Sequence, residues 1–254
     1  IFGRVYVVSA YAGVTNDLLE HKKTSQPGIY KLFEDQENYP RKMLALRDHL
    51  IELNERLADC GLDVDEANDF IGDRIDLSIN ILRSMENVLA SGYVSRGELL
   101  LAARELLASL GEMHSAYNSA NILKNKGFQS TFVDLSGWED GRQLTIDQRI
   151  KDSFDNVDPF SSICFATGYT KGTEGIMREF DRGYSEVTFS KVAVLLGASE
   201  AIIHKEYHLC SGDPLLIGEE TAHPVCNTNY DVADQLADVG MEAIHPRAAS
   251  RYGD

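Results

Sequence analysis

The second half of the chain alternates short apolar runs with helical patterns, and this alternation limits the possible folds more than any other feature. The runs are bounded by Gly, Ser or Pro and read STFVDLSGW, SSICFATGY, EAIIHKEYH and MEAIHP. Helical patterns at 145–154, 186–196 and 230–239 accompany them. Strands that alternate with helices are typical of crossover units, which build a mostly parallel sheet covered on both faces. The sequence therefore predicts an α/β fold, a three-layer sandwich around a mostly parallel central sheet.

The first half of the chain is predicted to be mostly helical after one opening strand. Residues 5–10 are β-branched, aromatic and small, which is a short buried-strand pattern. Apolar residues then recur every three or four positions at 41–60, and similar patterns predict helices at about 65–90 and 98–126. No linker or internal repeat divides the chain, so we expect one domain over residues 1–254.

Composition excludes several classes of protein. Of the 254 residues, 43% are hydrophobic and 25% are charged, which is an ordinary globular balance. The formal net charge of -16 argues against a broad nucleic-acid-binding face. The four cysteines are far apart and no run of about 18 apolar residues could cross a membrane. We therefore expect a cytoplasmic protein without a nucleic-acid or membrane partner.

Ligands of open α/β sheets bind at the carboxyl ends of the strands, so the loops after Val8, Val94, Phe165 and Ile203 are the first places to inspect. The first loop, SAYAGVTND from Ser9, has small residues that let backbone amides approach a ligand. The alternative is a tight turn capped by Thr15 or Asn16.

Glu98 follows the second of these loops, directly after Gly97 at an expected helix start. A carboxylate there gains from the helix dipole, which is the structural explanation. The functional alternative is that Glu98 receives the ammonium group of a substrate.

The third loop is a glycine-rich stretch, ATGYTKGTEGIMREFDRGYSE, that runs into an amphipathic helix. A long segment of this kind without apolar periodicity suits a ligand-covering loop or hairpin. An anion at Gly183 to Glu186 would meet free backbone N–H groups, with Arg182 as a bidentate clamp for a carboxylate. Ser185 as a plain N-cap is the alternative.

The fourth loop follows an expected strand at IIHKEYH. His204 and His208 would lie roughly 13 Å apart on a strand, so a zinc site is not expected, and no residue is assigned to a metal. Lys205 is a better candidate for a phosphate contact than either histidine is for a metal. A solvated lysine at the end of a strand is the alternative.

These four clusters, in this order, resemble the catalytic domain of aspartate kinases, members of the amino-acid kinase superfamily. VVSAYAGVTN is similar to the family's strand and S-A-x-x-G-V-T-[ND] turn, and RGEL resembles its G-E helix start. TGYTKGTEGIMREFDRGYSE is similar to the hairpin that ends in G-R-G-x-S-D, and NTNYDVADQLADVGMEAIHPRA to a late segment ending in H-P-x-[AT]. The segments FDRGYSE and GMEAIHPRA are closer still to those of the aspartate kinases associated with ectoine biosynthesis.

The resemblance implies transfer of the γ-phosphoryl group of ATP to the β-carboxylate of L-aspartate, with Mg²⁺, in a homo-oligomer. It implies that residues 1–254 are the catalytic domain without the family's first strand, which bears K-x-G-G-T-S, and without its C-terminal regulatory domains. Its residue roles divide into three groups. Catalytic roles fall to Ser185 and Glu186; substrate binding to Ser9, Thr15, Glu98, Arg182 and Gly183; nucleotide binding to His204, Lys205, Asp213 and Pro214.

The chain departs from the family pattern at several of these positions. Glu186 stands where the family usually has Asp, and the nucleotide motif T-D-V-D-G-[IV]-Y-x-x-D-P-R survives only as Asp213-Pro214. His204 and Lys205 replace its T-D pair. Two alternatives therefore stay open: a kinase with another acceptor, such as glutamate, acetylglutamate or carbamate, and a non-catalytic amino-acid-binding module.

Overall fold

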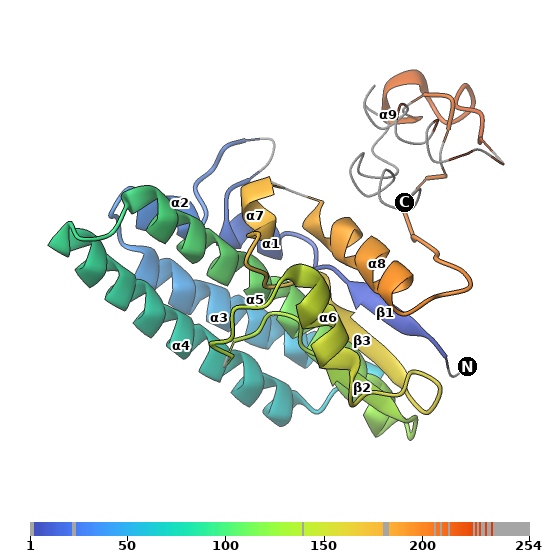
Figure 1. Cartoon of the computed structure of the whole chain (residues 1–254), viewed down its shortest axis with the longest axis horizontal. Helices are drawn as coiled ribbons and strands as arrows, with labels where there is room; N and C mark the ends of the chain where they lie inside the picture. The colour runs from blue at the N-terminus through green and yellow to red at the C-terminus, as the bar shows by residue number, and fades with distance from the viewer. Residues whose placement is uncertain are drawn as a thin grey trace. The chain divides into compact units, whose positions relative to one another are not determined.

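The computed structural model divides the chain into two compact units, Ile1–Asp181 and Arg182–Asp254 (Figure 1). The residues described are 3–21, 24–138, 140–179, 183–205, 207–208, 210–212, 214–225, 227, 229, 232 and 235. The first unit holds the sheet and the long helices, and the second holds the helix that follows the glycine-rich stretch.

A three-stranded parallel sheet forms the centre of the first unit. Its strands are β1 (Val5–Val8), β2 (Ser130–Val133) and β3 (Ile163–Thr167), in the spatial order β1-β3-β2. Parallel pairing aligns Val8 with Thr167 and Val133 with Ala166, so the three strands end at one edge. The predicted α/β class with a parallel sheet is confirmed.

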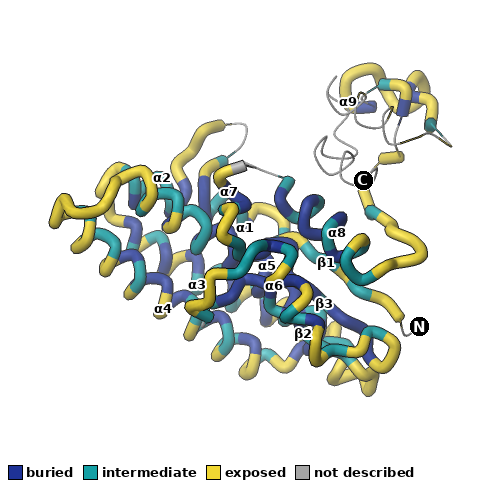
Figure 2. The backbone as a smooth tube through the Cα atoms, viewed as in Figure 1, coloured by how far each residue is buried: buried dark blue, intermediate teal, exposed yellow. Residues whose placement is uncertain are grey.

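Helix α5 (Arg96–Asn125) is the central element of this unit. It contacts all three strands and also packs against α4 (Val64–Ser91), which in turn packs against α3 (Tyr39–Arg56). Because α5 lies between the sheet and these helices, its residues from Leu107 to Ala116 are all buried (Figure 2). A helix covered on both sides has no solvent-facing stripe, and this explains why both apolar and polar residues of this stretch are buried.

The remaining elements are short. The first unit also contains α1 (Val14–Leu18), α2 (Ile29–Glu34), η1 (Ala58–Cys60), α6 (Ile146–Phe154) and α7 (Ile176–Glu179); the second contains α8 (Tyr184–Leu195) and α9 (Pro214–Ile217). Side chains fix two of the helix starts. Thr145 and Gln148 form a reciprocal capping box at α6, and Asp63 accepts a hydrogen bond from Glu66 N at α4.

Two expectations about strands are wrong. The run at 201–205 forms no strand among the described residues, because no neighbouring strand pairs with it there. Val94 ends no strand either, since residues 92–95 only connect α4 to α5. The expected helix at 230–239 and the run MEAIHP lie almost wholly outside the described residues. Among the helices that are described, none combines the length and the apolar character that crossing a bilayer requires.

Candidate functional site

Backbone and side-chain hydrogen bonds draw the loops after the three strands together at the carboxyl edge of the sheet. Gly168 N donates to Val8 O at 3.0 Å, which joins the ends of β3 and β1. Leu135 N donates to Thr167 Oγ1 at 3.0 Å, and Lys171 N donates to Leu135 O at 2.9 Å, which join the ends of β2 and β3. The loops that the sequence indicated for ligand binding after Val8 and Phe165 therefore meet in one place.

The loop after β1 lies directly on the middle of α5. Ser115 Oγ donates to Ser9 O at 2.7 Å. A Cβ atom at Gly111 would lie 2.7 Å from the Cβ of Ala10 and 3.0 Å from a methyl carbon of Val14. Only a residue without a side chain allows this approach, so Gly111 lets the Ser9 loop touch the helix.

The loops after β2 and β3 reach the same helix on either side of that contact. Trp138 Nε1 donates to Ser109 Oγ at 2.9 Å, and Ser136 Oγ lies 3.4 Å from Met113 Sδ. Tyr169, which follows β3, donates its hydroxyl to Glu105 Oε2 at 2.5 Å. Burial raises the pKa of Glu105, which the bond from Tyr169 opposes.

Glu112 lies within the stretch of α5, from Glu105 to Ser115, that these loops contact. It sits between Gly111, which contacts the β1 loop, and Met113, which contacts the β2 loop. It is seven residues from Glu105, so both carboxylates lie on one face of the helix. Its exposed fraction is only 2%. The sequence analysis missed Glu112, although a second Gly-Glu pair, 14 residues after Gly97–Glu98, was a visible signal.

Glu98 lies elsewhere on the same helix. It is 17 residues before Ser115, which is about 25 Å along a helix that rises 1.5 Å per residue. Its carboxylate is mostly exposed and pairs with Arg178 of α7 at 2.7 Å. The structure therefore does not bring Glu98 and Ser9 to one amino-acid-sized site.

Thr15 lies inside α1, not at its cap. The helix begins at Val14, and Gly13 precedes it in the left-handed conformation with φ 87°. The alternative explanation of Thr15 or Asn16 as an N-cap is therefore wrong. Thr15 stays half-buried, one turn beyond the Ser9 loop.

Lys171 supplies a cation beside the three loops, and two carbonyls hold it. Its ammonium donates to Gly137 O at 3.1 Å and to Asp140 O at 2.9 Å. Burial and the nearby Arg149 lower the pKa of this lysine. Arg142 and Arg149 in turn hold the pKa of Asp140 well below its usual range. These charges fasten the β2 loop to the β3 loop.

In the second unit, helix α8 positions two of the predicted catalytic residues. Gly183 precedes it with φ 82°, so Ser185 is the second residue of the helix and not its cap. Glu186 pairs with Lys205 at 2.5 Å, which brings a predicted catalytic residue to a predicted nucleotide-binding one.

The other predicted nucleotide residues are placed less closely. His204 is exposed, and Pro214 is the buried first residue of α9. Arg182 and Asp213 lie outside the described residues. No group of three or more His, Cys, Asp or Glu side chains in the described part of the chain could hold a metal ion.

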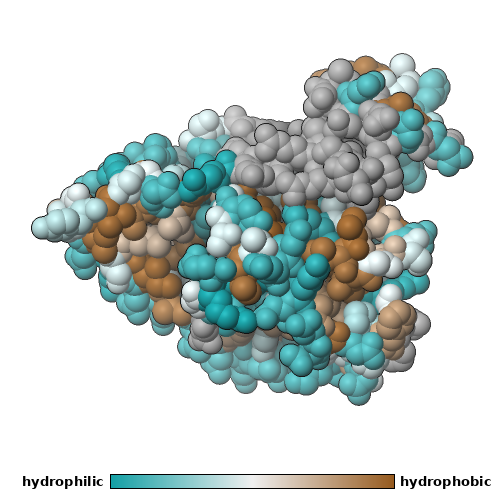
Figure 3. Space-filling view, in the orientation of Figure 1, coloured by the Kyte–Doolittle hydropathy of each residue, from teal (hydrophilic) through white to brown (hydrophobic). Residues whose placement is uncertain are grey.

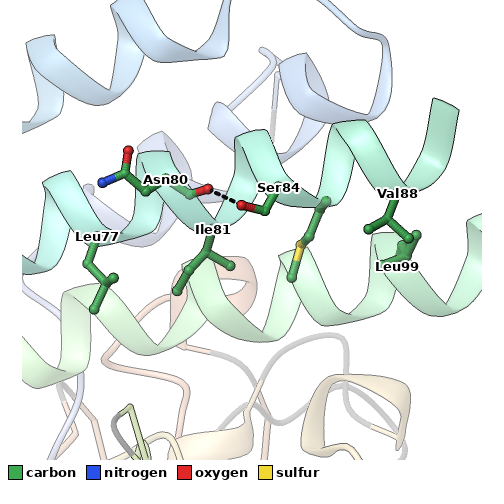
Figure 4. A pocket seen from close by; sticks show the side chains of 7 residues that line it. Leu77, Asn80, Ile81, Ser84, Val88 and Leu99 are labelled. Atoms are coloured by element: carbon green, nitrogen blue, oxygen red, sulfur yellow. Dashed lines mark hydrogen bonds between the residues drawn. The ribbon is translucent and has the colours of Figure 1, made fainter. Parts of the chain in front are cut away.

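The first unit also has an apolar groove, which lies between α4 and α5. Its volume is about 390 Å³, and its lining comprises Leu77, Asn80, Ile81, Ser84, Met85, Val88 and Leu99 (Figure 4). Apolar residues also gather on the surface along this groove (Figure 3). The lining holds no titratable side chain, so the groove offers no group for acid–base or phosphoryl chemistry.

Comparisons with known proteins agree with this architecture. The chain is 45% identical to aspartate kinase Ask_Ect of Stutzerimonas stutzeri strain A1501 over 98% of its own length and 53% of that protein. It is 27% identical to an aspartokinase of Geobacillus stearothermophilus over 73% of its own length and 46% of that protein. The chain thus spans about half the length of these curated relatives.

A solved structure has the same fold. The crystal structure of E. coli aspartokinase III in complex with aspartate and ADP matches with a TM-score of 0.68 at 20% identity, over 96% of this chain and 52% of that one. The model of the amino acid kinase family matches residues 3–251. With nearly its whole length covered by that model, the chain belongs to the amino acid kinase family.

Proposed function

We propose that the protein is an aspartate kinase, which transfers the γ-phosphoryl group of ATP to the β-carboxylate of L-aspartate and yields 4-phospho-L-aspartate. Two relatives are named as aspartate kinases, and the structural neighbour is described with aspartate and ADP. By resemblance we further propose a cytoplasmic homo-oligomer in aspartate-family biosynthesis, of the ectoine type.

The observation that carries this proposal is the buried Glu112 beside the Ser9 loop. A carboxylate interacts far more strongly with a cation away from bulk water than at the surface, because the local dielectric constant is lower. The ammonium group of a free amino acid is a cation of suitable size. We therefore assign the ammonium contact to Glu112 and not to Glu98.

The other predicted residues keep their proposed roles. Ser9, Thr15, Gly183 and Arg182 would contact the substrate, with Arg182 pairing with a carboxylate. The start of α8, with Ser185 and Glu186, would face the reacting phosphate, where the positive end of the helix dipole favours negative charge. His204, Lys205, Asp213 and Pro214 would contact the nucleotide.

Phosphoryl transfer asks a protein mainly for positioning and for neutralisation of charge. The acceptor is a carboxylate that is already ionised at neutral pH, so the reaction needs no general base. Mg²⁺ commonly binds through one or two carboxylates together with substrate phosphates and water. Among the described residues, no group of three or more possible ligands could hold a metal ion by itself. This agrees with an ion that arrives with ATP. Glu186 is the carboxylate of α8 that could meet it.

The test is a hydroxamate assay on the complete gene product that carries this sequence, with MgATP and a panel of acceptors. L-aspartate should give hydroxamate, whereas L-glutamate, N-acetyl-L-glutamate and carbamate should give only the background without acceptor. Product from another acceptor would identify a different kinase of the family. Amino-acid binding without any nucleotide turnover would favour a non-catalytic module.

A further inference from the structure

A buried network of amides and one imidazole lies behind the Ser9 loop, and the residue roles above do not use it. Its centre is Asn54 of α3, whose Oδ1 accepts from Asn118 Nδ2 at 2.8 Å and lies 2.7 Å from His114 Nε2. Asn54 Nδ2 donates to Asn68 of α4 at 2.8 Å. Asn54, His114 and Asn118 are completely buried. The network therefore links all three long helices inside the protein.

His114 Nε2 lies within hydrogen-bond distance of two side chains, Asn54 Oδ1 at 2.7 Å and Asn118 Nδ2 at 3.1 Å. The carbonyl oxygen of Asn54 can only accept, so a hydrogen bond to it requires the imidazole proton on Nε2. One oxygen then receives two N–H bonds, which leaves the rings and amides few alternative rotamers. Burial lowers the pKa of His114 to about 4, so the ring is neutral near pH 7.

The network reaches the candidate site through Tyr11. The ring of Tyr11 meets that of His114 edge-on, with centroids 5.5 Å apart. The Asn118 side chain also acts on the Tyr11 hydroxyl, because burial raises the pKa of Tyr11 and the Asn118 amide opposes that rise. Tyr11 is two residues beyond Ser9, whose carbonyl is held by Ser115 on the same helix. Three residues within five positions of α5, namely His114, Ser115 and Asn118, thus act on one loop.

We propose that Asn54, His114 and Asn118 act as a positioning network, which holds Tyr11 and so fixes the Ser9 loop relative to Glu112. All three are completely buried, so they act through Tyr11 and not on a substrate directly. The consequence for aspartate affinity rests on the proposed function, whereas the consequence for the loop does not.

The chain supplies a matched control one turn further along α5. Asn121 is also buried, with Oδ1 accepting from Asp63 N at 2.9 Å and Nδ2 donating to Glu66 at 2.9 Å. It joins α5 to the start of α4 as Asn118 joins α5 to α3. Its side-chain hydrogen bonds go to α4, α5 and the residue before α4, so its loss should cost stability without freeing the loop.

The first readout is hydrogen exchange at the amides of Val14 and Asp17, which donate to Tyr11 O and Gly13 O. Loss of buried hydrogen bonds should make these amides exchange about 10-fold faster in Asn118→Ala and leave them unchanged in Asn121→Ala. Equal exchange in both variants, or no change in either, would overturn the proposal. If Asn118→Ala does not fold, Tyr11→Phe serves instead, because it removes only one hydroxyl. It should speed exchange at the same amides by a smaller factor. Unchanged exchange in Tyr11→Phe would also overturn the proposal.

The second readout is aspartate kinetics in the complete gene product. Asn118→Ala should raise the KM for aspartate about 10-fold, more than the KM for MgATP, whereas Asn121→Ala should change neither. Loop exchange that changes as expected in a protein that phosphorylates no aspartate would remove the proposed function and keep the network. If Asn118→Ala phosphorylated aspartate with an unchanged KM, the proposed function would stand and the role of the network in aspartate affinity would be lost.

Discussion

Replacing Glu112 by glutamine should separate aspartate binding from nucleotide binding. The change keeps the shape of a side chain that is only 2% exposed and removes its charge. A hydrogen bond to a charged group contributes about 1.5–3 kcal/mol, and each 1.4 kcal/mol is a factor of ten. We therefore expect Glu112→Gln to raise the KM for aspartate about 10- to 100-fold.

Steady-state kinetics with each substrate varied in turn measure this effect, and Glu98→Gln is the matched control. The pair between Glu98 and Arg178 is more than half exposed on both sides, and such surface pairs contribute about 0–1 kcal/mol. Its loss should change the KM for aspartate by less than about 5-fold. In Glu112→Gln, the KM for MgATP should stay near the wild-type value.

The reverse ranking would refute the reasoning. If Glu98→Gln raised the KM for aspartate strongly and Glu112→Gln did not, the ammonium contact would lie at the start of α5. An equal rise in both Michaelis constants for Glu112→Gln would indicate a general loss of structure. Thermal unfolding of both variants, measured in parallel, identifies that case.

Two further predictions concern the stability of the first unit. His114 has a folded pKa of about 4, below the unfolded value of about 6.5, so the stability from its neutral form is complete above pH 6.5 and falls as pH drops toward 4. At pH 5, His114 should lower the free energy of unfolding by about 2 kcal/mol relative to pH 8. Urea unfolding of His114→Gln should therefore show a weaker dependence of stability on pH. An unchanged dependence would contradict this. Gly111→Ala should destabilise by about 1–3 kcal/mol because its Cβ meets Ala10 at 2.7 Å. Gly72→Ala in α4 meets nothing within 4 Å and should stabilise by roughly 0.5–1 kcal/mol, so equal melting shifts in the two variants would count against the close contact at Gly111.

Much of the fold could be predicted from periodicity. The helices expected at 65–90 and 98–126 were found as α4 and α5 within a few residues of their bounds. The β-branched runs before Ser9 and Gly168 became paired strands. The run at 201–205 did not, because an apolar run becomes a strand only where a partner offers its backbone, and pairing is not a local property of the sequence.

The site was harder to predict because it depends on distances along one helix. Two Gly-Glu pairs occur in α5, and a motif alone does not say which one lies under the strand ends. The answer depends on where the sheet packs on the helix: Gly111 admits the Ser9 loop, whereas Gly97 has no close neighbour except the hydroxyl of Ser95. Periodicity does not encode this register, and a wide buried face such as that of α5 removes the usual clue from amphipathicity.

The most direct test of the account compares L-aspartate with N-acetyl-L-aspartate as acceptors, in the wild type and in Glu112→Gln. Acetylation removes the ammonium charge and leaves both carboxylates. If Glu112 receives that ammonium, the wild type should prefer L-aspartate strongly in kcat/KM, and the preference should fall about 10-fold or more in the variant. A preference of the same size in both proteins would contradict the assignment of Glu112.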